Sequence, residues 1–142
     1  METRDTPQRG VIAVVCRQGR LLVVRRSQRV VAPGAYCFPG GGVEAGESEP
    51  QALQREMLEE LGVPTRPQCR IWKSTTAWGV SLSWWAAELL DFRLRPDPAE
   101  VESFQWLTVA EVRALDGLLS SNHEFLDAIE GGKIIFPEQT GG

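Results

Sequence analysis

Residues 41–63 constrain the fold more than any other stretch, because they join a glycine-rich loop to an amphipathic helix. Ser48 suits the N-cap position, Pro50 is tolerated in a first turn, and Gly62 stands where a helix C-terminus favours glycine. Successive residues turn by about 100° around a helix, so apolar and acidic side chains separate onto opposite faces. The apolar face holds Leu53, Met57, Leu58 and Leu61, and the acidic face holds Glu56, Glu59 and Glu60. The pattern predicts a helix that packs through one side and concentrates negative charge on the other.

The three carboxylates suit a divalent cation. Like charges at i,i+3 and i,i+4 destabilise a bare helix, whereas Mg2+ prefers carboxylate oxygens together with water and phosphate oxygens. A solvated acidic surface is the simpler alternative, since acidic helix faces are common. That alternative leaves unexplained why Arg55 lies inside the acidic cluster and why Gly40–Gly42 precede the helix. Arginine holds carboxylates through forked hydrogen bonds, and glycine lets the backbone approach a phosphate closely. The arrangement therefore favours a magnesium site beside a phosphate-binding loop.

At these residues the chain resembles the Nudix hydrolase family of MutT-like nucleoside diphosphate-X hydrolases. The family signature is Gly-x5-Glu-x7-Arg-Glu-U-x-Glu-Glu-x-Gly-U, in which U is a bulky apolar residue. Every fixed position is matched, by Gly41, Glu47, Arg55, Glu56, Met57, Glu59, Glu60, Gly62 and Val63. The resemblance implies an α/β fold, namely a Nudix-type α/β/α sandwich with a mixed β-sheet and the Nudix loop-helix-loop. It also implies hydrolysis of a nucleoside diphosphate linked to another group, with Mg2+ or Mn2+ as cofactor.

The resemblance further implies roles for individual residues. The metal would be bound by the carboxylates of Glu56, Glu59 and Glu60 and by the backbone carbonyl of Gly40. Glu47 and Arg55 would form a supporting pair that orients the helix carboxylates. The general base varies among relatives, and two alternatives stay open: the first Glu of the helix, or a Glu on a later loop. Glu100 and Glu102 are the loop candidates, with Glu100 preferred because it follows the proline-containing segment 95–98.

Phosphate binding is expected of two further elements. The backbone of Gly40 and Gly41 can approach the substrate, and Arg25 and Arg26 end a predicted strand where relatives often contact phosphates. Adjacent strand residues point to opposite faces. At most one of the two arginines is therefore expected to face the site.

Along the chain, the pattern predicts strands and helices in the order of a layered α/β domain. Strands are expected at 11–15 and 21–24, as a hairpin, then at 36–39, 70–76, 80–90 and 103–107. Residues 64–67 are expected to form a break, 134–136 a last extended segment, and 108–115 and 121–129 two late helices, the first with a capping box. We expect one domain at 9–136, with a flexible tail at 1–8 and a C-terminal tail at 137–142.

Composition limits the function classes. The 142 residues carry a net charge of −4, which gives no basic footprint for stable nucleic-acid binding. Cys16, Cys37 and Cys69 are odd in number without metal-site spacing, so we expect buried thiols in a reducing compartment. The N-terminus has no apolar signal core and no segment is long enough to span a membrane. We expect a cytoplasmic monomer or homodimer that acts on a small nucleotide-type substrate.

Two aromatic or polar features admit more than one interpretation. Trp78 lies in a predicted turn, where base stacking or a dimer contact competes with an ordinary surface role, while the other tryptophans favour core packing. His123, the single histidine, is interpreted as a surface residue of the late helix.

The substrate is left open by the sequence. The short domain resembles nucleoside triphosphate pyrophosphohydrolases, including those acting on modified nucleotides, more than ADP-ribose, nucleotide-sugar, dinucleotide or coenzyme A diphosphatases. A non-catalytic nucleotide-binding module of the same fold is an alternative from a different class, although the intact carboxylate set disfavours it. An isoprenoid diphosphate isomerase of the same superfamily would use a catalytic cysteine, for which Cys37 is the one near the site.

Overall fold

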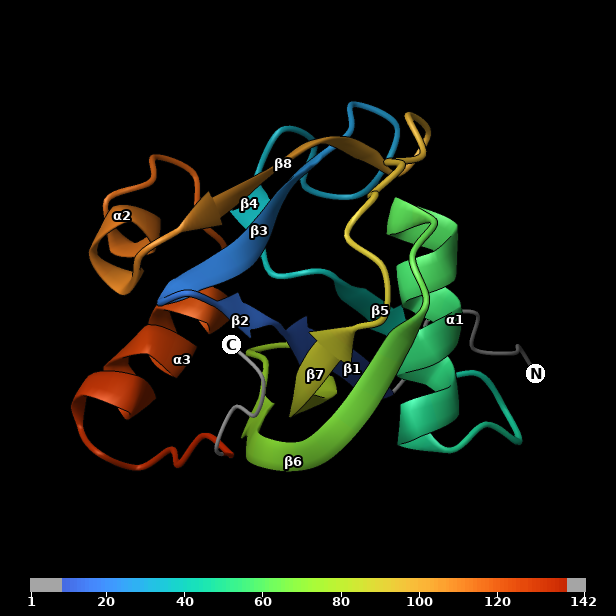
Figure 1. Ribbon diagram of the computed structural model, residues 1–142. Helices are drawn as coiled ribbons and strands as arrows, with labels where there is room; N and C mark the ends of the chain where they lie inside the picture. The colour runs from blue at the N-terminus through green and yellow to red at the C-terminus, as the bar shows by residue number, and fades with distance from the viewer. Residues whose placement is uncertain (1–8, 138–142) are drawn as a thin grey trace.

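The computed structural model describes residues 9–137, and within them a central β-structure lies between helices on two sides (Figure 1). The helices are α1 (Glu49–Leu61), α2 (Val109–Arg113) and α3 (Ser120–Glu130). The strands are β1 (Arg9–Val14), β2 (Cys16–Arg17), β3 (Arg20–Arg26), β4 (Tyr36–Cys37), β5 (Gly40–Gly42), β6 (Thr65–Thr75), β7 (Ser81–Leu89) and β8 (Val101–Leu107). In Figure 1, α1 covers one side of the strands, and α2 and α3 cover the other.

The strands form two sheets. The first has the order β5-β1-β7-β6, in which β1 and β7 are parallel and the other neighbours are antiparallel, so it is mixed. In the second, β3 pairs antiparallel with each of β2, β4 and β8. The predicted α/β sandwich with a mixed sheet is confirmed.

Two apolar clusters fill the spaces between the strands and the helices. One packs the buried face of α1 against β1, β3 and β7, and the other packs α2 and α3 against the opposite faces of the same strands. In β3, Leu22 and Val24 point into the first cluster, whereas Leu21 and Val23 point into the second. Strands covered on both faces read as continuous apolar runs rather than alternating ones, which explains the run at 21–24.

Several predicted elements differ in detail. The hairpin expected from the runs at 11–15 and 21–24 forms only next to its turn, where β2 pairs with β3 and the Leu22 N–H donates to the Val15 carbonyl at 3.0 Å. The rest of the first run, in β1, pairs in parallel with β7 instead. Residues 64–67 are not a break throughout: β6 begins at Thr65, and irregular register at Pro67 lets the strand accommodate the proline. The helix expected at 108–115 is shorter, and residues 134–136 form neither helix nor strand, although Ile134 is buried.

The three cysteines have different environments. Cys37 is buried as expected, but Cys16 is half-buried and Cys69 is exposed on β6, so the expectation of three buried thiols was wrong. Within residues 9–137, no disulfide joins any of the three. The tails expected at 1–8 and 137–142 lie outside the described residues, apart from Pro137.

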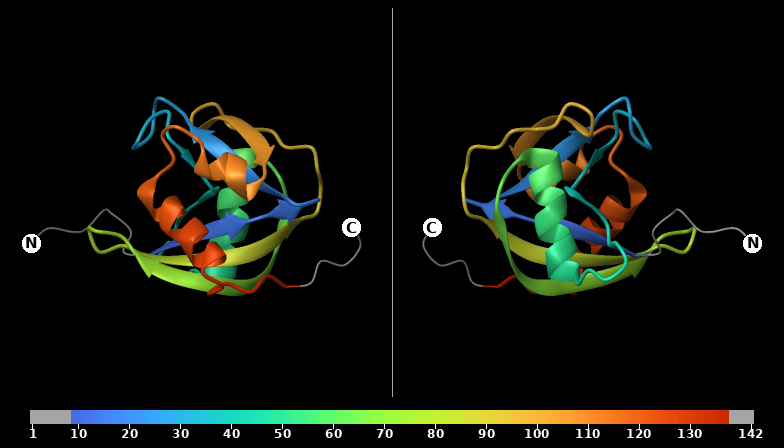
Figure 2. Two further views of the ribbon diagram at one scale, coloured as in Figure 1. Left: turned by 90° about the vertical axis from the view of Figure 1, so that its left-hand side faces the viewer. Right: turned by 90° about the vertical axis from the view of Figure 1, so that its right-hand side faces the viewer.

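The tryptophans divide between core and surface. Trp84 is fully buried and stacks on Phe125 with ring centroids 4.4 Å apart. Trp78 is 78% exposed at the tip of the β6–β7 hairpin, which Figure 2 shows projecting beyond the body of the molecule. Trp84 therefore packs in the core as expected, and Trp78 lies on the surface.

Candidate active site

Helix α1 positions the acidic face, because its ends and its buried side are all specified locally. Ser48 and Gln51 form a capping box at the N-terminus, and Gly62 ends the helix in the left-handed conformation that favours glycine. Ala52, Leu53, Met57 and Leu61 are fully buried against the sheets. With that side fixed, Glu56 and Glu60 turn toward a cavity that residues of β3 and β5 also line.

Arg55 is the centre of the acidic cluster. Its Nε donates to Glu47 at 2.6 Å and one Nη donates to the other oxygen of the same carboxylate at 2.9 Å. The same nitrogen donates to the Gly42 carbonyl at 2.8 Å, while the second Nη donates to Glu56 at 3.0 Å and to Glu59 at 3.2 Å. One guanidinium therefore holds the loop before α1 and two helix carboxylates in a single arrangement.

The hydrogen bonds that Glu47 accepts determine its protonation state. The bond from Arg55 lowers the pKa of Glu47 to about 2, helped by the backbone N–H of Glu44. The pKa of Arg55 rises in turn, chiefly through the Glu47 carboxylate. The supporting pair expected from the sequence is thus brought together as a charged, bidentate pair.

Glu56 and Glu60 lie deeper than the rest of the acidic face. The Glu56 side chain is 12% exposed and Glu60 is buried, and the two carboxyl groups hydrogen-bond to each other. Burial raises the pKa of both, and the charge of Glu56 raises that of Glu60 further, so that it lies well above the usual range. The backbone N–H of Gly40 donates to Glu60 and opposes this shift.

The glycines of β5 are required by close approach. A Cβ on Gly41 would lie 2.2 Å from the carboxyl carbon of Glu56, and a Cβ on Gly40 would lie 2.1 Å from the Val11 carbonyl oxygen. Both distances are far below normal contact. The glycine strand therefore passes directly under the carboxylates because neither residue has a side chain.

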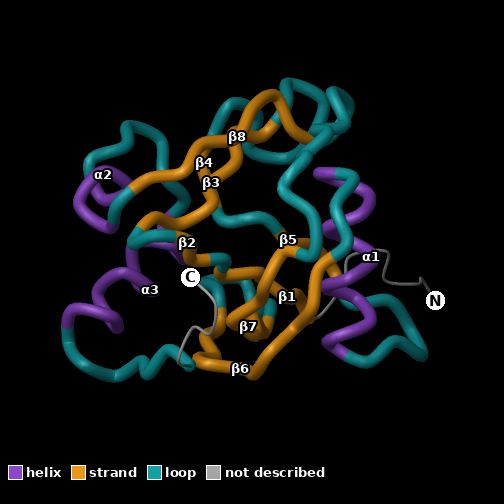
Figure 3. The backbone as a smooth tube through the Cα atoms, in the orientation of Figure 1, coloured by secondary structure: helices purple, strands orange, loops and turns teal. Residues whose placement is uncertain are grey.

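The loop between β7 and β8 brings in Glu100. The backbone N–H groups of Arg95 and Asp97 donate to the Leu61 and Glu60 carbonyls at 2.7 and 2.9 Å, so the loop caps the C-terminal end of α1. Figure 3 shows this loop running past that end of the helix. Ser27, at the end of β3, fixes the other side: its hydroxyl donates to Ala99 at 2.8 Å, and its N–H donates to Glu100 at 3.1 Å.

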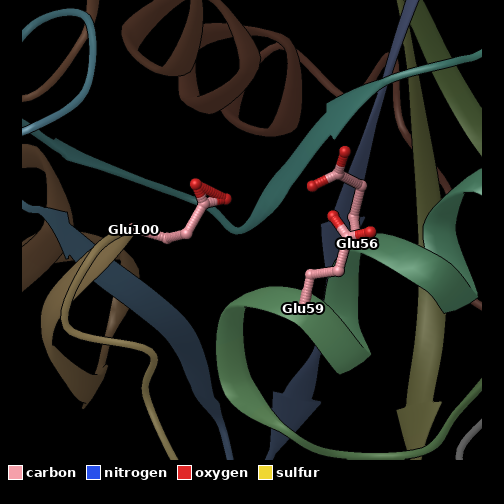
Figure 4. A group of neighbouring side chains, drawn as sticks. All are labelled: Glu56, Glu59 and Glu100. Atoms are coloured by element: carbon pink, nitrogen blue, oxygen red, sulfur yellow. The ribbon is translucent and has the colours of Figure 1, made fainter.

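The loop carboxylate meets those of the helix. Single oxygens of Glu56, Glu59 and Glu100 all lie within 4.8 Å of one another. Figure 4 shows Glu56 and Glu59 extending from α1 and Glu100 reaching toward them from the loop before β8. Glu102, the other loop candidate, instead pairs with Arg25 at 3.3 Å.

A cavity of about 220 Å3 lies at this meeting point. Its acidic wall is formed by Glu56, Glu60 and Glu100, and Gly40 and Gly41 also line it. The apolar and remaining lining residues are Val24, Val30, Cys37, Val101 and Arg26.

Of the two arginines that end β3, Arg26 lines the cavity. Its Nε donates to the Val31 carbonyl at 2.6 Å, and one Nη lies 4.0 Å from the Cys37 sulfur. Within residues 9–137, Arg26 forms no ion pair. Arg25 points the other way, toward Glu102 and over the Tyr36 ring.

The donor set fits a divalent cation. Glu60 and Glu100 have no cationic partner within the described part of the chain, and Glu60 is buried beside a second carboxylate. Buried carboxylates are neutralised by protons, by a paired cation or by a metal ion. Carboxylate oxygens are the ligands that Mg2+ and Mn2+ prefer. The residues that would hold such an ion are Glu56, Glu59, Glu60 and Glu100.

Two features near the site gave no recognisable signal in the sequence. Ser27 anchors the Glu100 loop, and Asn122 on α3 accepts a hydrogen bond from the Phe38 backbone. Cys37, which the sequence places near the site, lies in the cavity wall. Burial raises the pKa of the Cys37 thiol to about 11. His123 lies next to Asn122 and is half-buried, outside the cavity lining.

Comparison with known proteins identifies the family. The NUDIX domain family model matches residues 6–129. The chain belongs to the Nudix family. Among solved structures, this Nudix chain is similar to a MutT protein from Methanosarcina mazei Go1, with a TM-score of 0.76 and 18% identity over 92% of this chain and 98% of that chain. It is also similar to the Escherichia coli ORF135 protein, with a TM-score of 0.70 and 25% identity over 89% of this chain and 90% of that chain.

Two curated relatives of this Nudix chain have names that state an activity. A NAD-capped RNA hydrolase NudC from Stutzerimonas stutzeri is 35% identical over 103 residues, which are 72% of this chain and 37% of that protein. A CTP pyrophosphohydrolase from Escherichia coli K12 is 43% identical over 53 residues, which are 37% of this chain and 39% of that protein. The chain spans less than two fifths of the length of these relatives in the matched regions. Within residues 9–137, none of its helices combines the length and apolarity needed to cross a membrane.

Proposed function

We propose that this chain is a divalent-metal-dependent hydrolase that cleaves a diphosphate linkage in a nucleoside di- or triphosphate derivative. The observation that carries the proposal is a cavity lined by Glu56, Glu60 and Glu100 together with Arg26, which has no ion pair in the described residues. Oxygens of Glu56, Glu59 and Glu100 also lie within 4.8 Å of one another. Family membership and the pyrophosphohydrolase activities named for relatives support the same reaction class.

The charge distribution supports a division of roles across the cavity. Glu56, Glu59, Glu60 and Glu100 would hold Mg2+ or Mn2+, which would supply Lewis-acid activation of the diphosphate and of the attacking water. Arg26 lines the same cavity, with its Nε bonded to the Val31 carbonyl and one Nη close to the Cys37 sulfur, which leaves the other Nη to bind a phosphate. Arg55 keeps Glu56 and Glu59 in place, and the absence of a side chain on Gly41 lets the backbone pass close to Glu56.

Between the two possible general bases, the contacts favour Glu100. Glu56 is already hydrogen-bonded to Arg55 and Glu60, whereas Glu100 enters the cavity from the loop without a cationic partner in the described residues. A carboxylate in this position can accept the proton of water as it attacks phosphorus. The pairing of Glu102 with Arg25, outside the cavity lining, argues against Glu102 in this role.

For the substrate, we propose a nucleoside triphosphate, ordinary or modified, that is cleaved to a nucleoside monophosphate and pyrophosphate. The similarity to a CTP pyrophosphohydrolase over residues that form part of this domain supports that class. ADP-ribose, nucleotide sugars, dinucleotides, coenzyme A and NAD-type caps are the other substrates to compare.

Product analysis on such a panel with Mg2+ or Mn2+ tests the proposal. We expect release of a nucleoside monophosphate by the parent protein. Glu100→Gln should reduce kcat by about 10²–10⁴-fold, and Glu60→Gln should reduce it at least as much. Glu102→Gln is the matched control, since it removes a neighbouring carboxylate outside the cavity, and its kcat should stay within about 3-fold of the parent.

Other outcomes would reject parts of the proposal. Retained activity in Glu60→Gln would refute the assignment of Glu60 to the metal site. Equal losses of kcat in Glu100→Gln and Glu102→Gln would refute the assignment of Glu100 as general base. Metal and nucleotide binding without turnover on the whole panel would indicate a binding module. Rearrangement of an isoprenoid diphosphate without bond cleavage by water would indicate an isomerase.

A further inference from the structure

Asn122 breaks the apolar pattern of α3. The residues that α3 buries include Asn122, Phe125 and Leu126, at i, i+3 and i+4, which is the spacing of a core-facing stripe. Asn122 is 2% exposed, so the polar amide occupies a position where packing alone favours an aliphatic side chain. A buried amide is costly unless its hydrogen bonds are made, which directs attention to its partners.

The Asn122 amide holds the segment between β4 and β5, which leads to the glycines. The Asn122 Oδ1 accepts the Phe38 backbone N–H at 2.9 Å, and its Nδ2 donates to the Ser121 hydroxyl at 3.1 Å. Phe38 is buried and lies between β4 and β5, outside both strands. A buried N–H at such a position needs an acceptor from elsewhere, and α3 supplies it.

The neighbouring backbone is fixed on both sides of this bond. Tyr36 donates to Gly117 at 2.9 Å and accepts from Leu119 at 3.0 Å, so the segment before α3 is attached to β4. On the other side, Pro39 accepts from Ala13 of β1 at 2.8 Å. The Asn122 bond is thus the link between two anchored points, only two residues before Gly40.

The carboxylates tolerate little movement of this strand. Gly40 donates its N–H to Glu60, and Gly41 is so close to Glu56 that even a methyl group cannot be placed between them. A shift of the backbone at Phe38 would therefore change the separation of the strand from both carboxylates.

We infer that Asn122 is a positioning residue of the carboxylate site, which acts by fixing the Phe38–Gly41 backbone beneath Glu56 and Glu60. The inference rests on the proposed function, in which those carboxylates hold the metal ion. Asn122 itself does not line the cavity. Its effect should thus fall on metal affinity and kcat and leave KM nearly unchanged.

Manganese binding, followed by electron paramagnetic resonance, tests this role without requiring turnover. Asn122→Ala removes the acceptor and should weaken Mn2+ binding by about 10–100-fold, as loss of a residue that orients metal ligands commonly does. The kcat should fall in parallel and KM should change by less than about 3-fold. Asn122→Asp retains an oxygen acceptor and should recover most of the Mn2+ affinity.

Two controls separate positioning from general stability. Ser121→Ala removes the other hydrogen bond of the amide and should bind Mn2+ like the parent. Leu126→Ala creates a cavity in the same helix without touching the Phe38 N–H, and should lower the unfolding temperature while leaving Mn2+ affinity intact. Parent-like Mn2+ affinity in Asn122→Ala, or an equal loss in Leu126→Ala, would overturn the role.

A measurement on the unmodified protein covers the case in which Asn122→Ala does not fold. Mg2+ should slow amide hydrogen exchange at Phe38 more than at the buried amides of Phe125 and Leu126. Equal slowing at all three would overturn the inference. A parent protein that binds Mn2+ without turnover would count against the proposed function alone, whereas one that binds no Mn2+ would remove both.

Discussion

Gly41→Ala is the sharpest test of the site geometry, because the added methyl group meets the carboxylate and nothing in the backbone opposes it. The φ angle of Gly41 is not among the positive values that disfavour L-residues. An alanine Cβ at this position would lie 2.2 Å from the Glu56 carboxyl carbon and 2.4 and 2.5 Å from its oxygens. The Glu56 carboxylate therefore has to move.

The required movement can be sized from these distances. Ordinary contact with a Cβ begins near 3.4 Å, so the carboxylate must shift by about 1.2 Å, and its 3.0 Å bond to Arg55 is then broken or distorted. A misplacement of about 1 Å at a reacting centre costs roughly 10²-fold in rate. We expect kcat to fall about 100-fold, with a modest stability loss because the displaced atoms are the end of a flexible side chain.

A double-mutant cycle and a glycine control make this prediction specific. In a Glu56→Ala background, Gly41→Ala should cost no further activity or stability, because the clash is gone. Gly19→Ala, in the β2–β3 turn with φ +76 and nothing within 4 Å, should show the opposite profile: about 1–2 kcal/mol of stability lost through backbone strain, with kcat unchanged. Parent-like kcat in Gly41→Ala, or an equal cost of Gly41→Ala with and without Glu56, would refute the reasoning.

Two further predictions concern stability. The pKa of Glu47 is lowered to about 2 from an ordinary value of 4.5. The ionised Glu47 therefore stabilises the fold fully above about pH 4.5, and this stabilisation is lost as pH falls toward 2. In urea unfolding, the difference in unfolding free energy between the parent and Glu47→Gln should shrink over that pH range, and a pH-independent difference would contradict the assignment. Trp84→Ala should cost about 3–5 kcal/mol because it removes a fully buried ring, whereas Trp78→Ala should change stability by less than about 0.5 kcal/mol; comparable losses in urea unfolding would show that the hairpin tip is not a free surface.

The local sequence was sufficient to predict helix α1 and the face on which its glutamates lie. Ser48 and Gly62 define the ends of α1, and the spacing of the glutamates predicts which side they share, because both depend on neighbours within one or two turns. The pairing of Glu47 with Arg55 was expected only through the family resemblance, since its geometry depends on how the preceding loop folds back.

The parts that depend on distant pairing were harder to predict. The run at 11–15 is apolar like its neighbour, and nothing local tells that β1 pairs with β7, some 70 residues later, instead of forming a hairpin. Which of Arg25 and Arg26 faces the cavity depends on the register of β3 against β4 and β8. Alternation limited the choice to one residue, and only the fold selected Arg26.

The spacing of the helix glutamates alone would describe an ordinary acidic surface. Two contacts from outside the helix distinguish this face: the β7–β8 loop docks on the last carbonyls of α1 and brings Glu100 toward it, and β5 passes so close that Glu56 has no room beneath it. Both contacts remove water from carboxylates that would be solvated on an isolated helix. This loss of solvation raises the pKa of Glu56 and Glu60. In the proposed function, the loop and the strand packed against the acidic face would make it a cation site, and not its charge alone.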